Sequence, residues 1–186
     1  LLADMDEEEK AILRNLNLLT SKPVLYVCNV AEADAATGNA HSQAVAAMAE
    51  KQGASSVIIS AAIESEIAQL PEEEVGDYLE AMGLTEPGLD RLIRAGYELL
   101  DLITYFTAGP KETRAWTIDK GTKAPQAAGV IHTDFEKGFI RAQTIAFTDF
   151  VALGGEVGAK EAGKSRDEGK EYVVADGDIM NFKFNV

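Results

Sequence analysis

Cysteine and long apolar runs are scarce in this sequence. Cys28 is the only cysteine among 186 residues, which excludes an internal disulfide and a cysteine-based zinc site and suits a reducing compartment. No apolar run approaches the roughly 18 residues that a membrane-spanning helix needs, so we expect no membrane partner. The first residues, LLADMDEEEK, lack an initiator methionine and do not resemble a signal or transit peptide. We therefore expect a cytoplasmic chain that begins within a longer protein.

Basic residues are also few. Lysine and arginine number 17 against 31 aspartates and glutamates, which gives a formal net charge of −14. The imbalance lies in residues 1–100, which hold 6 basic and 18 acidic residues, whereas residues 101–186 hold 11 and 13. Because an acidic surface repels nucleic acid on average, any RNA contact is expected at the cations near the C-terminus. The alternative is a solvated loop of mixed charge. These cations are Lys160, Lys164, Arg166 and Lys170.

The first hundred residues follow an α/β pattern. Asp6 fits the N-cap of a first helix, and Gly53 fits the C-cap of an alanine-rich helix. Two apolar runs, PVLYVCN and SSVIIS, are typical of strands buried on both faces of a parallel sheet. Strand, crossover helix and strand form a βαβ unit, which implies parallel strands. The expected elements are a helix over 6–19, strands over 23–29 and 55–60, a helix over 39–52, and short acidic helices over 63–82.

The pattern changes after a helix that is expected over 85–101. Thr85 is its expected N-cap, and its apolar stripe runs from Leu89 to Leu100. Beyond it, aromatic and β-branched segments are separated by glycine, proline and aspartate turns, which predicts a small mixed β domain from residue 102. The expected strands are LITYFT, TRAWTI, FIRAQTIAF and DIMNFKFNV. The predicted fold class is therefore α/β plus α+β.

One segment, GAKEAGKS over 158–165, satisfies the P-loop pattern G-x-x-x-x-G-K-[ST] of phosphate-binding proteins. A working P-loop joins the end of a buried strand to the N-terminus of a helix, because backbone N–H groups must converge on the phosphates. The flanking segments, TDFVALGGEV and RDEGKEYVV, predict neither that strand nor that helix. We interpret GAKEAGKS as a surface loop rather than a phosphate site.

A better nucleotide signal lies at the ends of the two expected parallel strands, where open α/β sheets bind ligands. NVAE follows the first strand at residues 29–32, and Ser60-Ala61 follows the second. GTPase-type domains hold a guanine base with N-K-x-D and S-A-[KL] at these places. Here Val30 replaces the lysine and the longer Glu32 replaces the aspartate, so the sequence does not predict guanine specificity. A helix-capping turn is the alternative interpretation of NVAE.

Longer segments carry a resemblance to a known family. Besides NVAE they are ISAAIESEIAQL, GLTEPGLDRLIRAGYELLDLITYFTAGPKETRAWTI, APQAAGVIHTDFEKGFIRAQTI and EGKEYVVADGDIMNFKFNV. Over its whole length the chain resembles the YchF family of Obg-like ATPases, P-loop proteins of the TRAFAC class that prefer ATP to GTP. In that family a G domain, which carries a helical coiled-coil insertion, is followed by a TGS domain of β-grasp type.

The resemblance implies a domain for every part of the chain. Residues 1–19 would be the return helix of the coiled-coil insertion. Residues 20–84 would be the C-terminal part of the P-loop G domain, including its parallel βαβ unit. Residues 85–101 would be a connecting helix, and residues 102–186 the TGS domain.

The resemblance also implies a site and partners. The base contacts would come from Asn29, Val30, Glu32, Ser60 and Ala61. The true P-loop, the Mg²⁺ ligands and the residue that positions water would precede this chain, so the chain holds no expected catalytic residue and should not hydrolyse ATP alone. The whole protein is expected to be a cytoplasmic, monomeric ATPase that binds the ribosome or its RNA and acts in translation or stress response. The alternative is a TGS-type module that binds RNA or the ribosome without catalysis.

Some remaining residues also invite a functional interpretation. His132 in IHTDF is expected to make a turn hydrogen bond or a partner contact, because the resemblance places it far in sequence from the nucleotide residues. Trp116, Phe135, Phe139 and Phe147 carry rings of the kind that stack on RNA bases. Packing in the core of a small β domain explains these four more simply.

Overall fold

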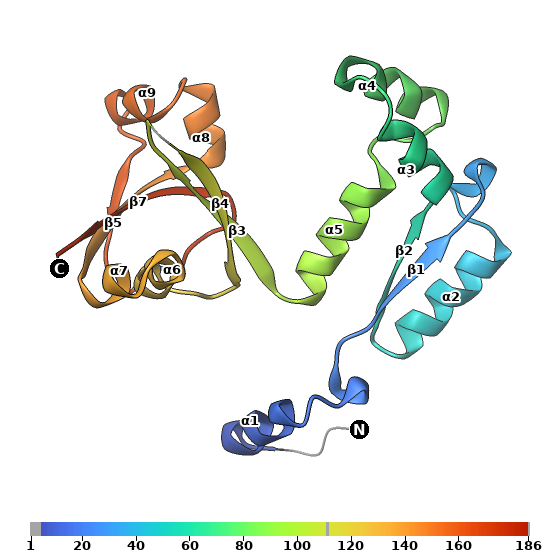
Figure 1. Ribbon diagram of the computed structural model, residues 1–186, viewed down its shortest axis with the longest axis horizontal. Coiled ribbons are helices and arrows are strands. Elements are labelled where there is room, and N and C mark those ends of the chain that lie inside the picture. The colour runs from blue at the N-terminus through green and yellow to red at the C-terminus, as the bar shows by residue number, and fades with distance from the viewer. Residues whose placement is uncertain (1–4, 111, 186) are drawn as a thin grey trace. The chain divides into compact units, whose positions relative to one another are not determined.

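Figure 1 shows the computed structural model of the chain, which describes residues 5–110 and 112–185. The chain divides into two compact units, Leu1–Leu99 and Leu100–Val186. Each unit has a β-sheet and a hydrophobic cluster of its own.

The first unit alternates between helices and strands. Its elements are α1 (Glu7–Asn15), η1 (Leu19–Ser21), β1 (Leu25–Asn29), η2 (Glu32–Asp34), α2 (Ala40–Lys51), β2 (Ser55–Ile59), α3 (Ala61–Ile67), α4 (Glu72–Ala81) and α5 (Gly88–Leu99), where η marks a 3₁₀ helix. β1 and β2 pair in parallel, from Leu25 opposite Ser55 to Asn29 opposite Ile59. Since α2 is the crossover between them, the predicted βαβ unit is confirmed.

Helix α2 begins and ends close to the predicted positions. Asn39 is its N-cap, because the Asn39 Oδ1 atom accepts hydrogen bonds from the backbone N–H groups of His41 (3.0 Å) and Ser42 (3.1 Å). The Asn39 N–H in turn donates to the Ser42 hydroxyl oxygen (2.9 Å), which completes a capping box. At the other end Gly53 adopts a φ of 65°, a left-handed conformation that glycine tolerates at little cost. The chain therefore turns directly into β2.

The two strands of the first unit are less buried than their apolar sequences predict. Neither strand contains a fully buried residue, and Val27 at the centre of β1 is 45% exposed. Helices α2 and α5 both pack on this sheet (Figure 1), but it has no third strand among residues 5–110 and 112–185. The expectation that these strands are buried on both faces is therefore wrong, because full burial of a strand also requires neighbouring strands.

Helix α1 has the predicted start but ends early. The Asp6 Oδ1 atom accepts hydrogen bonds from the N–H groups of Glu8 and Glu9, each at 2.9 Å, which confirms Asp6 as the N-cap. The helix ends at Asn15 rather than near residue 19. Asn17 explains the difference, because it adopts a φ of 50°, which an α-helix cannot contain.

Helix α5 begins later than predicted, at Gly88, so Thr85 is not its N-cap. Pro87 explains the shift, because a proline disfavours helical backbone at the residue before it, here Glu86. The N–H of Gly88 donates instead to the side chain of Glu64 in α3, at 2.7 Å. A side chain from a distant helix thus replaces the local cap.

The apolar stripe of α5 is only partly covered. Leu92 and Leu99 are half-buried, whereas Leu89 and Ile93 are each 51% exposed and Leu100 is 56% exposed. The stripe is therefore wider than a two-stranded sheet can cover.

The second unit is built on a five-stranded mixed sheet. Its elements are β3 (Leu102–Ala108), β4 (Thr113–Asp119), α6 (Ala124–Ile131), α7 (Thr133–Lys137), β5 (Phe139–Ala146), α8 (Phe147–Ala152), α9 (Glu156–Glu161), β6 (Arg166–Glu168) and β7 (Asp178–Phe184). The strand order is β4-β3-β7-β5-β6, with β3 and β7 parallel and the other neighbours antiparallel. The four predicted strands are confirmed, and the short helices between them are additional.

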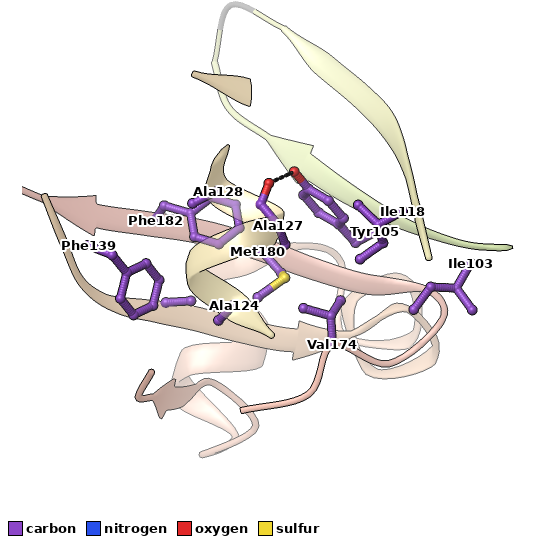
Figure 2. Close-up of a cluster of buried hydrophobic side chains, with 11 residues drawn as sticks. Ile103, Tyr105, Ile118, Ala124, Ala127, Ala128, Phe139, Val174, Met180 and Phe182 are labelled. Carbon is purple, nitrogen blue, oxygen red and sulfur yellow. Dashed lines mark hydrogen bonds between the residues drawn. The ribbon is translucent and has the colours of Figure 1, made fainter. Parts of the chain in front are cut away.

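Figure 2 shows the core of the second unit, where strand side chains meet α6. Tyr105 of β3 is fully buried, and its hydroxyl donates to the carbonyl oxygen of Ala127 at 2.9 Å. Its ring meets Phe182 of β7 edge to face, with the ring centroids 5.8 Å apart. Ala124 and Ala128, like Ala127, have no exposed surface, so small side chains let α6 lie close to the strands. Burial also raises the pKa of the Tyr105 hydroxyl above its usual value.

Most of the aromatic residues singled out from the sequence belong to this core. Phe139 is buried, and Trp116 and Phe135 pack against the same cluster. Phe147 differs, because it is 49% exposed. Core packing therefore accounts for three of the four.

We expect Tyr105→Phe to lower the free energy of unfolding of the second unit by about 1 kcal/mol, because the buried Ala127 carbonyl loses a donor. Trp116 is the only tryptophan and lies in this unit, so its fluorescence during urea unfolding reports on the second unit. Tyr26→Phe is the matched control, since the Tyr26 hydroxyl donates to Gln52 in the first unit (2.8 Å). Equal shifts of the Trp116 transition in both variants would contradict the assignment.

Alkaline pH should lower the free energy of unfolding of the second unit, because the buried Tyr105 hydroxyl must keep its proton in the folded state. The folded Tyr105 keeps its proton above the pH at which an unfolded tyrosine releases it, so the stability that this proton carries is lost as pH rises above about 10. The midpoint urea concentration, measured between pH 8 and 11, should fall less steeply for Tyr105→Phe than for the unmodified chain. Parallel curves would show that Tyr105 does not contribute.

Candidate functional site

The predicted base residues come together at one edge of the first unit's sheet. β1 ends at Asn29 and β2 ends at Ile59, and the parallel register places these two residues side by side. The Asn29 Oδ1 atom accepts a hydrogen bond from the backbone N–H of Ala61, at 3.0 Å. A side chain at the end of one strand thus fixes the turn that follows the other. Asn29 and Ala61 are both exposed, so a ligand has access to this turn.

The chain between Asn29 and Glu32 forms a bend beside that contact. The Val30 N–H donates to the Ile59 carbonyl oxygen (2.9 Å), which extends the strand pairing by one residue. Glu32 begins η2 and is exposed. No side chain caps η2. Asn29 instead satisfies the first N–H of α3 from the neighbouring strand, so its side chain links the two predicted motifs.

Ser60 contributes differently from its neighbour Ala61. Ser60 is only 2% exposed, and its hydroxyl has no hydrogen-bond partner among the residues that the structure describes. Because the side chain is covered, this segment can meet a ligand only through the backbone or through Ala61.

Acidic side chains lie around this edge of the sheet. The Tyr78 hydroxyl of α4 donates to Glu66 of α3 at 2.5 Å. That hydrogen bond is the main reason why the pKa of Tyr78 is raised to about 12, and the negative charge of Glu32 adds to the effect. The negative charge of these carboxylates makes the edge unfavourable for a phosphate group.

Sequence reasoning missed the contact between Glu64 and Gly88. The Glu64 carboxylate of α3 accepts the Gly88 N–H of α5, and the two residues are 24 positions apart. No local pattern marks such a contact. The Pro-Gly pair after Glu86 is the only signal, because it indicates that the first N–H of the helix lacks a local cap.

The GAKEAGKS segment has the reverse order of a P-loop, because a helix precedes its turn and a strand follows. Gly158 lies within α9, and Gly163, the second residue after the helix ends, adopts a φ of 70°. The Gly163 N–H donates to the Lys160 carbonyl (3.0 Å) and the Lys164 N–H donates to the Ala159 carbonyl (2.8 Å). These two bonds form a Schellman motif, which ends a helix. The N–H groups that a P-loop presents to phosphates are therefore used within the turn.

The C-terminal cations are largely engaged by carboxylates of the chain itself. Arg166 is tied to a buried network, because it donates to the Tyr172 hydroxyl (3.1 Å), which donates in turn to the buried Asp178 (2.7 Å). Lys170 is exposed. Ion pairs join Lys160 to Glu156 (2.5 Å), Lys164 to Asp149 (3.4 Å) and Arg166 to Glu168 (3.0 Å). The four cations thus do not form an uncompensated positive patch.

The remaining candidates have structural explanations. The His132 Nδ1 atom accepts the Asp134 N–H at 3.2 Å and caps α7, which confirms the expected turn hydrogen bond. Cys28 is half-buried in β1. Within residues 5–110 and 112–185, no group of histidine, cysteine, aspartate and glutamate side chains is arranged to hold a metal ion. Over the same residues, no helix has the length and apolar character needed to cross a membrane.

Comparison with known proteins decides the family. Residues 102–185 match the family model YchF-GTPase_C, which is described as a protein of unknown function (DUF933). Over 183 residues the chain is 58% identical to the ribosome-binding ATPase YchF of Escherichia coli O157:H7. The chain belongs to the YchF family.

Other YchF relatives extend the comparison. The chain is 54% identical to the ribosome-binding ATPase YchF of Bacillus subtilis and 46% identical to Obg-like ATPase 1 of Rattus norvegicus, in each case over 185 residues. These alignments cover 98% of this chain, but only 50% of the two bacterial proteins and 46% of the rat protein. The chain thus spans about half the length of the curated relatives that it matches, and it corresponds to their C-terminal half.

Solved structures agree with this family. The structure of the Schizosaccharomyces pombe YchF GTPase superposes with a TM-score of 0.81 at 38% identity, over 97% of this chain and 48% of that one. A GTP binding protein from Pyrococcus horikoshii OT3 superposes with a TM-score of 0.62 at 18% identity, over 98% of this chain and 58% of that one. The second likeness concerns the fold alone. The mixed α/β architecture is therefore that of YchF proteins.

The Schellman motif after α9 generates a prediction. We expect Gly163→Ala to lower the free energy of unfolding of the second unit by about 1 kcal/mol, because a side chain strains the left-handed backbone. Gly169→Ala is the matched control, since Gly169 has no positive φ and no neighbour that an added Cβ atom would meet. Urea unfolding followed by Trp116 fluorescence measures both. Equal stabilities would contradict the role of Gly163.

Proposed function

We propose that this chain supplies the base-binding part of the nucleotide site of a YchF ATPase. The observation that carries the proposal is the hydrogen bond between the Asn29 side chain and the Ala61 N–H. It joins the carboxyl ends of two parallel strands, where open α/β sheets bind ligands. Relatives that are 58% and 46% identical to the chain are named ATPases, which supports the same activity for the whole protein.

The same contact supports adenine rather than guanine as the base. Adenine carries an amine donor at purine position 6, and guanine carries an oxygen acceptor there. The Ala61 N–H already donates to Asn29, so it is not free for the oxygen of guanine. Glu32 is longer than the aspartate of the GTPase motif and places its carboxylate differently against the guanine edge. We therefore propose that ATP is preferred to GTP.

The phosphates and Mg²⁺ must be held elsewhere. The described residues present no metal-binding cluster, and the GAKEAGKS turn uses its N–H groups internally. Phosphoryl transfer depends on a phosphate cradle and a bound Mg²⁺. We propose that both come from the part of the protein that this chain does not span, together with the residue that positions water. The 186 residues alone would then bind a base weakly and would not hydrolyse ATP.

The two units suggest how the functions are divided. We assign residues 20–84 to the C-terminal part of a G domain, on the basis of the parallel βαβ unit. Residues 102–186 are assigned to a TGS domain of β-grasp type, supported by a mixed sheet whose parallel pair, β3 and β7, is flanked by antiparallel neighbours and packed against α6. Residues 1–19 and 85–101 are assigned to the return helix of the insertion and to the connecting helix. Within these ranges, residues 1–4, 111 and 186 lie outside the described part of the chain.

The ribosome is the proposed partner of the whole protein. Bacterial relatives carry ribosome binding in their names. We propose a cytoplasmic monomer that acts in translation or stress response, with Lys160, Lys164 and Lys170 as contacts to ribosomal RNA. Arg166 is the weakest of the four expected contacts, because its guanidinium is engaged with Glu168 and Tyr172. A TGS module that binds RNA without catalysis remains the second candidate, and the exposed Lys170 favours it.

The base site can be tested in the whole protein that contains this chain. Asn29→Ala should weaken ATP binding roughly tenfold, because the turn at Ala61 loses the acceptor that holds it. Lys164→Ala should leave ATP binding and hydrolysis unchanged, since its turn is not a phosphate cradle. Titration with a fluorescent ATP analogue and steady-state hydrolysis provide the measurements. Loss of activity in Lys164→Ala, with normal binding in Asn29→Ala, would assign the nucleotide to GAKEAGKS instead.

Base preference gives a separate test. Glu32→Asp should raise the affinity for GTP relative to that for ATP, because the shorter carboxylate restores the guanine-binding side chain of the GTPase motif. Competition of ATP and GTP for the same fluorescent analogue measures this ratio. Glu66→Asp, which shortens a neighbouring carboxylate bonded to Tyr78, is the control. An unchanged ratio in Glu32→Asp would remove Glu32 from the base-specificity motif.

A further inference from the structure

Glu64 makes two contacts that meet at the candidate base site. Its backbone N–H donates to the carbonyl oxygen of Ser60 at 3.0 Å, in the first turn of α3. Its side chain accepts the N–H of Gly88 at 2.7 Å, at the beginning of α5. One residue thus connects the turn that carries Ser60 and Ala61 to a helix that lies much later in the sequence.

The contact at Gly88 is close and specific. Gly88 is buried, and a Cβ atom at this position would lie 2.9 Å from the Glu64 Oε1 atom and 3.3 Å from the Ile59 Cβ atom. Only a glycine lets α5 approach this closely without displacing Glu64. Because Pro87 has no N–H, the Gly88 N–H is the first backbone donor of this segment, and a carboxylate is its most favourable acceptor.

A second hydrogen bond holds the same two segments together. The Arg91 Nη2 atom, one turn further along α5, donates to the carbonyl oxygen of Ile58 in β2 at 3.2 Å. The first turn of α5 is therefore fixed on both sides of Ser60, by Glu64 after it and by Ile58 before it. A displacement of the Ser60-Ala61 turn must either strain these bonds or move the start of α5.

We propose that Glu64 is a positioning residue for the base, which holds the Ser60-Ala61 turn against the first turn of α5. The proposal rests on the proposed function, because it requires that a base binds beside Asn29 and Ala61. Base binding stabilises the turn, so it also stabilises the bond from Glu64 to Gly88 and orders the start of α5. By thermodynamic reciprocity, loss of that bond weakens base binding.

The linkage has a direction along the chain. Helix α5 ends at Leu99, which is the last residue of the first unit, and the second unit follows at Leu100. After α3 and α4 the chain comes back into contact with α3 at Gly88, through Glu64, before the second unit begins. Binding of a base therefore changes the order at the start of α5, which is the last helix before the second unit.

The test uses the whole protein that contains this chain, with ATP as the probe. ATP affinity is measured by titration, and amide hydrogen exchange over residues 88–95 is compared with and without ATP. In the unmodified protein, ATP should slow exchange in this segment. Glu64→Ala should abolish that slowing and weaken ATP binding roughly five- to tenfold, because a charge-assisted hydrogen bond is lost.

Matched variants separate positioning from general stability. Glu66→Ala removes the same side chain from the same helix but disturbs only the bond to Tyr78, so it should keep the ATP-dependent slowing. Glu64→Gln retains an acceptor oxygen, so it should keep most of the ATP-dependent slowing of exchange. Gly88→Ala disturbs the same contact at its donor end, so it should also abolish the ATP-dependent slowing. It keeps the test available if Glu64→Ala fails to fold.

The possible outcomes are distinguishable. If Glu64→Ala and Gly88→Ala both retain ATP-dependent slowing at residues 88–95, the positioning role is overturned while the base site stands. If Glu66→Ala loses the slowing as Glu64→Ala does, the effect is one of general stability and the role of Glu64 is again overturned. If Asn29→Ala leaves ATP binding unchanged, the base site itself is misplaced and both proposals fail.

Discussion

Parallel pairing of β1 with β2 is the constraint on which the candidate site depends. It brings Asn29 and Ile59 to the same edge, so that the segments after both strands begin side by side. One side-chain hydrogen bond, from the Ala61 N–H to Asn29, then converts two separate strand ends into a single surface. The crossover helix α2 and the contact of α5 with β2 serve the same arrangement, because both hold these strands in place.

The GAKEAGKS segment illustrates why spacing alone does not define a phosphate site. Both of its glycines have structural roles in the second unit. A Cβ atom at Gly158 would collide with the carbonyl oxygen of Leu153, and Gly163 provides the left-handed residue that ends α9. The lysine that follows pairs with Asp149. Helix packing and helix termination thus explain both glycines of the motif, and the order of helix and strand is opposite to that of a P-loop.

Local patterns in the sequence predicted the βαβ unit, the caps at Asp6 and Gly53, and the four main strands of the second unit. They also brought Asn29 and Ala61 to one site, because parallel strands necessarily end at the same edge. Burial could not be predicted in the same way, since the exposure of Val27 depends on which strands lie beside it. The start of α5 follows from Pro87, but the acceptor of the Gly88 N–H could not be predicted, because the contact with Glu64 has no signature in a local window of sequence.

The bond between Asn29 and Ala61 also bears on how such a site can diverge. Ala61 contributes only its backbone N–H, which every residue except proline possesses. Position 61 is therefore free to change its side chain during evolution, and within the described part of the chain the Glu32 side chain makes no hydrogen bond to Asn29 or Ala61. The frame of the site rests on the Asn29 amide and on the hydrogen bond from Gly88 to Glu64, while the side chains at positions 32 and 61 can change independently. Nucleotide preference can consequently change within the family without a new fold.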